Sequence, residues 1–324
     1  MQAHSDAIAM TDAGGDTLSP LVGSMLTPAD MSTARDWLMM LKPRVVLLVV
    51  YSGLAGLLVA PGHINPVIAF AAMLCIALGA GASGAINMWY DRDIDAVMKR
   101  TAKRPIPSGR IAPDDALGYG VFLAVASVIM MGLATNWFAA MLLAGSIFYY
   151  VVIYTMWLKR RTPQNIVIGG AAGAFPPLIG WAAVTGSLSV MPWILFGMIF
   201  MWTPPHFWSL SLWAHEDYKR AGVPMLPVVA GAKETRRQVM LYTIAMVPFT
   251  LLPWYLGYSG PVYGVSAALL GVWFLFDAWR VYTDTQDAIG ISLTNDKPAK
   301  ACFKYSILYL FALFGAVYID WAVR

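Results

Sequence analysis

Charged residues are scarce in this 324-residue chain, and their scarcity excludes most soluble folds. Asp, Glu, Lys and Arg make up 12% of the sequence and hydrophobic residues 59%, whereas a soluble domain has roughly 25% charged and 45–50% apolar residues. Continuous apolar stretches of about 20 residues are long enough to cross a bilayer as helices. A membrane β-barrel would instead show short segments of alternating polarity. We therefore expect an all-α polytopic membrane protein.

Cysteine is almost absent, and basic residues are missing from the N-terminal segment. The two cysteines, Cys75 and Cys302, are far apart and lie in or beside apolar runs, so a disulfide framework, a zinc site and covalent haem attachment are poorly supported. No Lys or Arg precedes Arg35, which excludes the basic start of a signal peptide and the arginines of a transit peptide. We expect a disordered tail over residues 1–35 and a transmembrane domain over residues 36–324.

Nine apolar segments are long enough to span the membrane. They cover residues 43–61, 66–89, 115–134, 137–157, 164–185, 190–213, 238–256, 262–280 and 302–321. The connecting loops alternate between nearly charge-free and basic, and every Lys and Arg except Arg324 falls on one side. The positive-inside rule makes that side cytoplasmic, with the C-terminus outside. Most of the excess of Lys and Arg is therefore explained by the orientation of the protein in the membrane.

Three oxygen-bearing side chains stand at helical spacing where the second segment ends. Asn87, Asp91 and Asp95 stand at i, i+4 and i+8, on one face of a continuing helix. Mg²⁺ prefers such ligands and is commonly completed by substrate phosphates. A solvated, ion-paired cap is the alternative for any one such loop, but three ligands in register favour a metal site. Asp93 is out of register and is expected to face solvent. The basic residues that follow suit a diphosphate: Arg100, Lys103 and Arg104.

A second polar cluster ends the sixth segment. Pro204 and Pro205 should break the helical ladder, and His206 beside them is an intramembrane ionisable residue, which is a functional candidate by default. A hydrogen-bonded interior histidine is the alternative. Asp217, followed by Lys219 and Arg220, repeats the first pattern in weaker form. Both loops lie on the cytoplasmic side, where they can face one another across a cavity.

The two clusters carry a resemblance to a known family. Asn87-x-x-x-Asp91-x-x-x-Asp95, with Arg104-Pro-Ile-Pro-Ser-Gly downstream, resembles the first motif of the UbiA-type intramembrane prenyltransferases. Pro204-Pro-His206-Phe-Trp-Ser-Leu, with the segment from Asp217 to Pro227, is similar to the branch of that family that farnesylates haem. The resemblance covers about residues 35–321, and it implies nine transmembrane helices around a central cavity.

The resemblance also implies an activity. The chain would transfer a farnesyl group from farnesyl diphosphate to a vinyl group of haem B, with Mg²⁺ assisting departure of the diphosphate and haem as substrate rather than prosthetic group. It implies a bacterial inner membrane location, with haem-copper oxidase assembly proteins as partners and no nucleic acid. The implied catalytic residues are Asn87, Asp91, Asp95, His206 and Asp217, the first three also holding the metal. The implied diphosphate-binding residues are Arg100, Lys103, Arg104, Lys219 and Arg220.

One departure from the family pattern leaves rival functions open. Many relatives carry a second aspartate pair at i, i+4, but here Trp213 stands four residues before Asp217. A prenyltransferase of a quinone precursor would be expected to carry that pair. A haem-handling transporter or chaperone is the rival from another class. Transporters often contain repeated halves with paired broken helices, whereas the Pro-Pro-His sequence occurs once.

Overall fold

The computed structural model describes residues 32–287 and 290–324. Within these residues the chain forms helices and one isolated antiparallel bridge, between Gln286 and Ser292. The tail predicted over residues 1–35 lies outside the described residues up to residue 31 and stays a prediction. The first described helix, α2, begins at Ala34, where the side chain of Thr33 caps its N-terminus.

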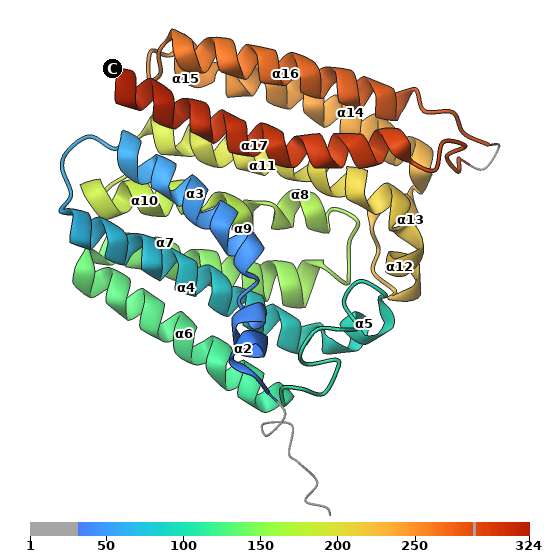
Figure 1. The fold of residues 1–324 in the computed structure, drawn as a ribbon, viewed down its shortest axis with the longest axis horizontal. Coiled ribbons are helices and arrows are strands. Elements are labelled where there is room, and N and C mark those ends of the chain that lie inside the picture. The colour runs from blue at the N-terminus through green and yellow to red at the C-terminus, as the bar shows by residue number, and fades with distance from the viewer. Residues whose placement is uncertain (1–31, 288–289) are drawn as a thin grey trace, which may run out of the picture.

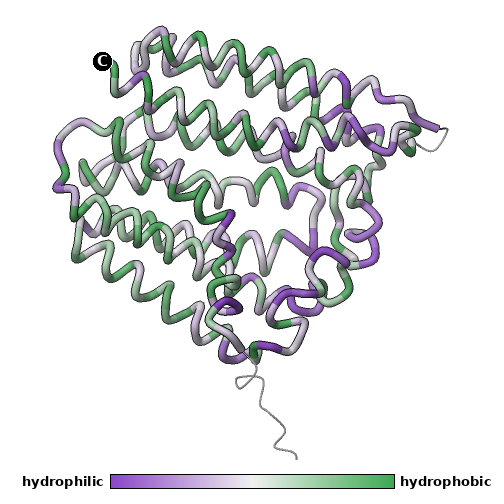
Figure 2. The backbone as a smooth tube through the Cα atoms, in the orientation of Figure 1, coloured by the Kyte–Doolittle hydropathy of each residue, from purple (hydrophilic) through white to green (hydrophobic). Residues whose placement is uncertain are grey.

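Long helices lie side by side and form most of the molecule (Figure 1). They are α3 (Pro43–Val59), α4 (Pro66–Tyr90), α6 (Pro113–Ala134), α7 (Trp137–Phe148) with its π-helical continuation η1 (Tyr149–Leu158), α10 (Pro176–Thr185), α11 (Val190–Trp213), α14 (Gly231–Thr250), α16 (Pro261–Tyr282) and α17 (Lys297–Val323). The shorter helices are α2 (Ala34–Met40), α5 (Arg92–Val97), α8 (Asn165–Gly169), α9 (Ala171–Ala174), α12 (His215–Arg220), α13 (Leu226–Val229) and α15 (Leu252–Tyr255). Hydrophilic residues gather at the end of the bundle that carries α5 and α12 (Figure 2).

Proline marks where many of these helices begin. Pro43, Pro66, Pro113 and Pro261 each occupy the first position of a long helix. The first turn needs no N–H from this position, and the fixed φ of proline suits the helix. The apolar runs that follow then continue as helix, because a bilayer leaves every backbone polar group to be satisfied within the segment.

Helices cover all nine apolar segments predicted from the sequence. Fewer of these helices are both long enough and apolar enough to count as membrane spans. Among the described residues six helical stretches qualify, or seven if α2 and α3, which meet at 50°, count as one. The polar start of α14, with Lys233, Glu234 and Arg236, lowers its mean hydropathy. The all-helical membrane fold is confirmed, whereas the number of nine spans stays a prediction.

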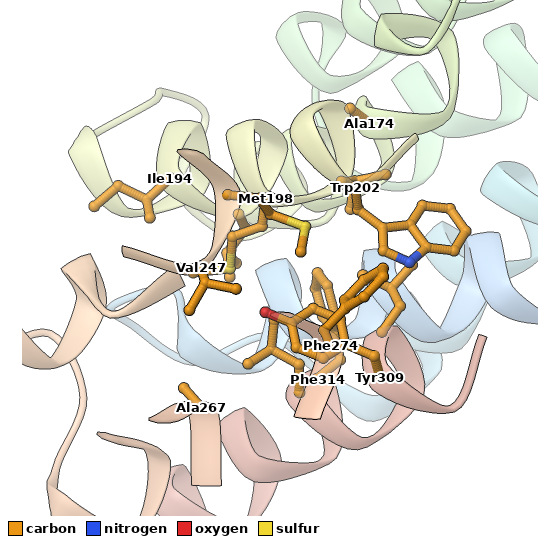
Figure 3. Close-up of a cluster of buried hydrophobic side chains, with 14 of the residues drawn as sticks. Ala174, Ile194, Met198, Trp202, Val247, Ala267, Phe274, Tyr309 and Phe314 are labelled. Carbon is orange, nitrogen blue, oxygen red and sulfur yellow. The ribbon is translucent and has the colours of Figure 1, made fainter. Parts of the chain in front are cut away.

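The apolar interior divides into two main cores. The C-terminal core lies between α11, α14, α16 and α17, where Trp202, Phe274, Tyr309 and Phe314 converge (Figure 3). The N-terminal core joins α3, α4, α6, α7 and α10; its buried side chains include Leu57, Ile76, Met131, Leu143 and Ile179. These cores fix the long helices, so the polar end of the bundle rests on a packed scaffold.

Helices α3 and α10 cross at backbone contact. A Cβ atom on Gly56 would overlap the carbonyl of Pro177, and one on Gly180 would overlap the carbonyl of Gly53. Small residues at membrane helix interfaces permit this close approach. The crossing therefore leaves no space between the two helices at this level.

Candidate active site

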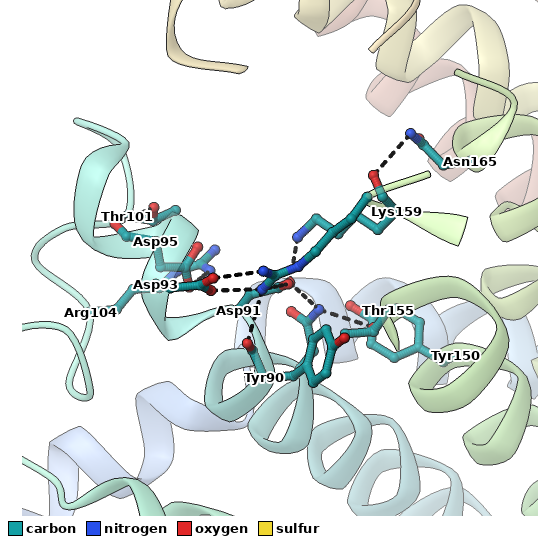
Figure 4. Close-up of polar contacts among 12 residues, drawn as sticks. Tyr90, Asp91, Asp93, Asp95, Thr101, Arg104, Tyr150, Thr155, Lys159 and Asn165 are labelled. Atoms are coloured by element: carbon teal, nitrogen blue, oxygen red, sulfur yellow. Dashed lines mark hydrogen bonds and ion pairs between the residues drawn. The ribbon is translucent and has the colours of Figure 1, made fainter. Parts of the chain in front are cut away.

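The predicted oxygen ligands lie where α4 gives way to α5. Asp91 links the two helices with φ −88° and ψ 9°. Its N–H donates to the carbonyl of Asn87 at 2.9 Å, and the N–H of Asp95 donates to the carbonyl of Asp91 at 2.8 Å. The i, i+4 spacing therefore continues across the junction. The structure brings the three residues together at the junction of α4 and α5, as predicted, and Figure 4 shows Asp91 and Asp95 there.

All three side chains are buried, and a hydrogen-bond network joins them to other helices. Exposed fractions are 3% for Asn87, 0% for Asp91 and 2% for Asp95. The Asn87 amide donates to Asp91 Oδ2 at 2.7 Å and to Thr155 Oγ1 at 3.1 Å. Lys42 Nζ donates to Asn87 Oδ1 at 2.7 Å. Residues from α4, η1 and the α2–α3 junction thus meet at one site.

Each buried carboxylate has a cationic partner. Lys159 Nζ lies 2.5 Å from Asp91 Oδ2, and Arg104 donates to Asp95 Oδ2 at 2.5 Å. Arg160 lies 3.5 Å from the other oxygen of Asp91. An unpaired buried charge would be strongly destabilising. The pairs therefore surround both buried carboxylates with several N–H donors.

Arg160 also holds Asp93 outside this buried group. Its guanidinium donates to both carboxylate oxygens of Asp93, at 2.6 and 2.7 Å. These bonds hold the pKa of Asp93 below its ordinary value and raise the pKa of Arg160. The Asp93 side chain is 60% exposed. It therefore faces solvent, as its position out of register predicted.

Lys42 is a site residue that sequence reasoning missed. It lies between α2 and α3 with φ 52°, a left-handed conformation that is uncommon for a residue other than glycine. From this bend its side chain reaches Asn87 and lies 3.5 Å from the hydroxyl of Tyr150. Nothing in the sequence marked Lys159 and Arg160 as part of the site either, because membrane orientation alone explains their charges. Their proximity to the second segment comes from the tertiary fold, and no local pattern marks it.

Three basic residues of the loop after α5 were predicted to bind diphosphate. One of them pairs directly with a buried carboxylate. Arg104 pairs with Asp95, and the hydroxyl of Thr101 donates to the Asp95 carbonyl at 2.9 Å. Arg100 and Lys103 are exposed and make no ion pair within residues 32–287 and 290–324. The structure therefore leaves these two cations at the surface of the loop.

The second polar cluster lies against the first through apolar contacts. Ile94 and Met98, from α5 and its end, share a buried cluster with Tyr218 of α12 and with Val223 and Met225 beyond it. The two loops therefore meet through buried apolar side chains, and the cavity expected between them stays a prediction. On α12 itself, Asp217 accepts a hydrogen bond from Arg220 at 3.1 Å, and Lys219 is exposed.

His206 faces α17 instead of the carboxylates. Helix α11 runs through Pro204 and Pro205 without a break, so the predicted interruption of the helix is wrong. His206 Nδ1 lies 2.7 Å from Ser306 Oγ, and its ring stacks between Trp202 and Phe303 at centroid distances of 4.3 and 4.7 Å. Among the described residues, Nε2 has no hydrogen-bond partner.

An apolar cavity of 110 Å³ adjoins the carboxylate site. It lies between α3, α4, α7, α9 and α10, and its lining includes Lys42 and Tyr150. Because Lys42 also bonds to Asn87, the polar site and the apolar cavity share one boundary. The arrangement suits a ligand with an anionic head and an apolar tail.

Comparison with known proteins assigns the family. The model of the UbiA prenyltransferase family matches residues 47–295. The chain belongs to the UbiA prenyltransferase family. This prenyltransferase is 64% identical over 316 residues to the protoheme IX farnesyltransferase of Acidiphilium cryptum, covering 98% of this chain and 99% of the relative. The protein of the same name from Granulibacter bethesdensis is 62% identical, with coverages of 95% and 96%.

Solved structures share the fold of the prenyltransferase. A chain from a study of digeranylgeranylglyceryl phosphate synthase superposes with a TM-score of 0.72 at 18% identity, covering 90% of this chain and 99% of that one. A UbiA homolog from Archaeoglobus fulgidus bound to GPP and Mg²⁺ gives a TM-score of 0.63 at 15% identity, with coverages of 87% and 99%. At these identities the likeness establishes the fold.

Proposed function

We propose that this prenyltransferase transfers the farnesyl group of farnesyl diphosphate to a vinyl group of haem B, which yields haem O and releases diphosphate. The observation that carries the proposal is the buried Asn87, Asp91 and Asp95 site at the boundary of an apolar cavity. The high identity to relatives named protoheme IX farnesyltransferase selects haem as the acceptor.

The donor set of the site fits Mg²⁺ that arrives with a diphosphate. Two carboxylates and an amide oxygen are hard ligands of the kind that Mg²⁺ takes when phosphate oxygens complete its shell. No group of three or more His, Cys, Asp or Glu suited to a metal occurs in the described part of the chain. Substrate phosphates and water would therefore complete the octahedral shell. Asn87, Asp91 and Asp95 would hold the ion. When bound, Mg²⁺ supplies Lewis-acid stabilisation of the leaving diphosphate.

The basic residues around the carboxylates would neutralise the rest of the diphosphate. Lysine has three donors and arginine five, so Lys42, Lys159 and Arg104 can hold a protein oxygen and a phosphate oxygen together. Arg100, Lys103, Lys219 and Arg220 are proposed to attract the diphosphate from the surface. Asp217 is proposed to orient Arg220, to which it is already bonded.

The chemistry balances with water as the co-reactant. The allylic C1–O bond of the donor breaks and its electron pair leaves with diphosphate. A new bond forms between C1 and the terminal carbon of the vinyl group. Water adds to the other vinyl carbon and loses a proton, which gives a hydroxyl group. Preorganised cations accelerate the first step because they stabilise charge where it develops.

His206 is proposed to contact haem through Nε2. His206→Ala is expected to lower kcat/KM for haem by at least about tenfold, because loss of a buried hydrogen-bonding partner costs roughly 1–3 kcal/mol. Ser306→Ala, which removes the partner of Nδ1 but keeps the imidazole, is the matched control and should have a smaller effect. Haem affinity from optical titration accompanies the kinetics. Unchanged turnover and affinity in His206→Ala would make His206 a packing residue.

The remaining proposals concern location and partners. The basic loops, the N-terminus and the site would face the cytoplasm of a bacterium, with the C-terminus outside, because the Lys and Arg distribution follows the positive-inside rule. Proteins that assemble haem-copper oxidases would receive the product. The orientation can be tested with single cysteines placed on either side of the bundle. The measurement is whether a thiol reagent that cannot cross the membrane labels each cysteine.

One incubation tests the function. Purified protein is supplied with haem B, farnesyl diphosphate and Mg²⁺, and the haem is analysed by mass spectrometry. We expect a haem heavier by one farnesyl group and one water-derived hydroxyl. Haem binding without a product would favour the transporter or chaperone alternative. Prenylation of a quinone precursor in place of haem would favour the sister enzyme.

A further inference from the structure

The apolar cavity follows one face of α4. Ile76, Ala80, Ser83 and Gly84 all line it, and their spacing of four, three and one residues keeps them on one side of the helix. The eight residues from Gly84 to Ile76 rise about 12 Å at about 1.5 Å per residue. The cavity is thus a channel whose length can be measured along this helix.

The mouth of the channel is the boundary with the carboxylate site. Lys42 lines the cavity and bonds to Asn87, and Tyr150 lies beside it. Under the proposed function, on which this inference rests, the diphosphate lies at the carboxylates. The first carbon of its prenyl chain must then enter the channel at this mouth.

The far end of the channel is closed by packed side chains. Ile76, Leu143 and Ile179 are 1%, 2% and 1% exposed and belong to the N-terminal core. The Cδ1 atom of Ile76 reaches across to α3, where it lies 3.2 Å from the position of a Cβ on Gly53. The backbone contact between α3 and α10 at Gly180 lies beside the same residue. These side chains form the floor of the channel.

We infer that this floor limits the length of the prenyl chain, with Ile76 as the residue that stops it. An extended isoprene unit is about 5 Å long, from four bonds of about 1.5 Å each. Each unit that passes the mouth therefore lies along about one turn of α4, and a chain longer than the channel meets the side chains of the floor.

One turn of α4 corresponds to one isoprene unit, because the helix pitch is about 5.4 Å. Ala80 lies one turn above Ile76 on the same face, so Ala80→Leu places a new floor one unit higher. Ala72 lies one turn below and is already small, so Ile76→Ala lowers the floor toward it. The two substitutions are expected to change chain length in opposite directions.

The experiment compares geranyl, farnesyl and geranylgeranyl diphosphates as donors, with haem B and Mg²⁺. In the wild type, kcat/KM for farnesyl diphosphate should exceed that for the geranylgeranyl donor at least about tenfold, as small size differences in an apolar pocket do. Ile76→Ala should raise the ratio of geranylgeranyl to farnesyl transfer at least about tenfold. Ala80→Leu should raise the ratio of geranyl to farnesyl transfer by a similar factor.

Leu57→Ala is the matched control for Ile76→Ala. It removes an aliphatic side chain from the same core but does not line the cavity. It should lower stability to a similar extent without changing the donor ratios. Because ratios between donors are compared within one variant, partial loss of folded protein cancels.

A binding experiment separates this inference from the proposed function. It measures by competition how well non-reacting thiodiphosphate analogues of the three donors bind. If no prenylated haem forms but the analogues show the same chain-length order and the same shifts, the floor is supported and the haem reaction is not. Equal use or binding of all three chain lengths by the wild type would overturn the inference. So would an Ile76→Ala variant whose donor ratios match those of Leu57→Ala.

Discussion

Asp91→Asn and Asp95→Asn are each expected to reduce farnesyl transfer about 100- to 1000-fold while the protein remains inserted and folded. Metal-assisted departure of the leaving group contributes several kcal/mol to the transition state, and each factor of ten in rate corresponds to about 1.4 kcal/mol. Asparagine keeps the shape of the side chain but removes the charge that would hold Mg²⁺. The measurement is the rate of haem prenylation as a function of Mg²⁺ concentration.

Asp93→Asn is the matched control for both variants. Asp93 lies between them in sequence, but its side chain is 60% exposed and its oxygens are bonded to Arg160. The same chemical change there should alter the rate less than about tenfold, in keeping with the small energies of exposed ion pairs. Full activity of Asp91→Asn or Asp95→Asn at limiting Mg²⁺ would contradict the metal assignment.

Lys42→Met is expected to lower kcat about 10- to 100-fold, because a hydrogen bond to or from a charged group contributes roughly 1.5–3 kcal/mol. The substitution keeps the apolar stem that lines the cavity and removes the ammonium group at its mouth. Inhibition by inorganic diphosphate should weaken in parallel, whereas haem affinity should not change. Lys42→Arg should recover part of the rate, since it restores the charge.

Arg44→Met serves as the control for Lys42→Met. Arg44 is exposed and lies two residues further along the chain, so the change removes a cation from the same segment without touching the site. Its rate and its inhibition by diphosphate should match those of the wild type. Equal losses in the two variants would mean that Lys42 acts only through the charge of the membrane surface.

Features that depend on residue spacing within one helix were predictable from the sequence. Apolar runs of helical length predicted the helices, and Asn87, Asp91 and Asp95 were found because helical spacing alone aligns them. The structure confirms that alignment through the backbone hydrogen bonds on either side of Asp91. Asp93 could be separated from the others by the same rule.

Contacts between distant segments could not be predicted in this way. Lys42 reaches Asn87 only because the chain bends at a residue with positive φ. Thr155 lies on η1, a π-helix that its apolar sequence does not distinguish from an α-helix. The pairing of His206 with Ser306 joins residues 100 positions apart. Each depends on how helices pack, and a single sequence carries no local signal for that.

The division into two cores has a consequence for the order in which the protein is made. The helices of the N-terminal core end at Thr185, so a growing chain contains all of them before α12 is synthesised. The carboxylate loop, however, shares its apolar cluster with Tyr218 and Met225. The helices of the N-terminal core are therefore made first. The apolar cluster that supports the carboxylate loop is complete only after the chain has been synthesised past Met225.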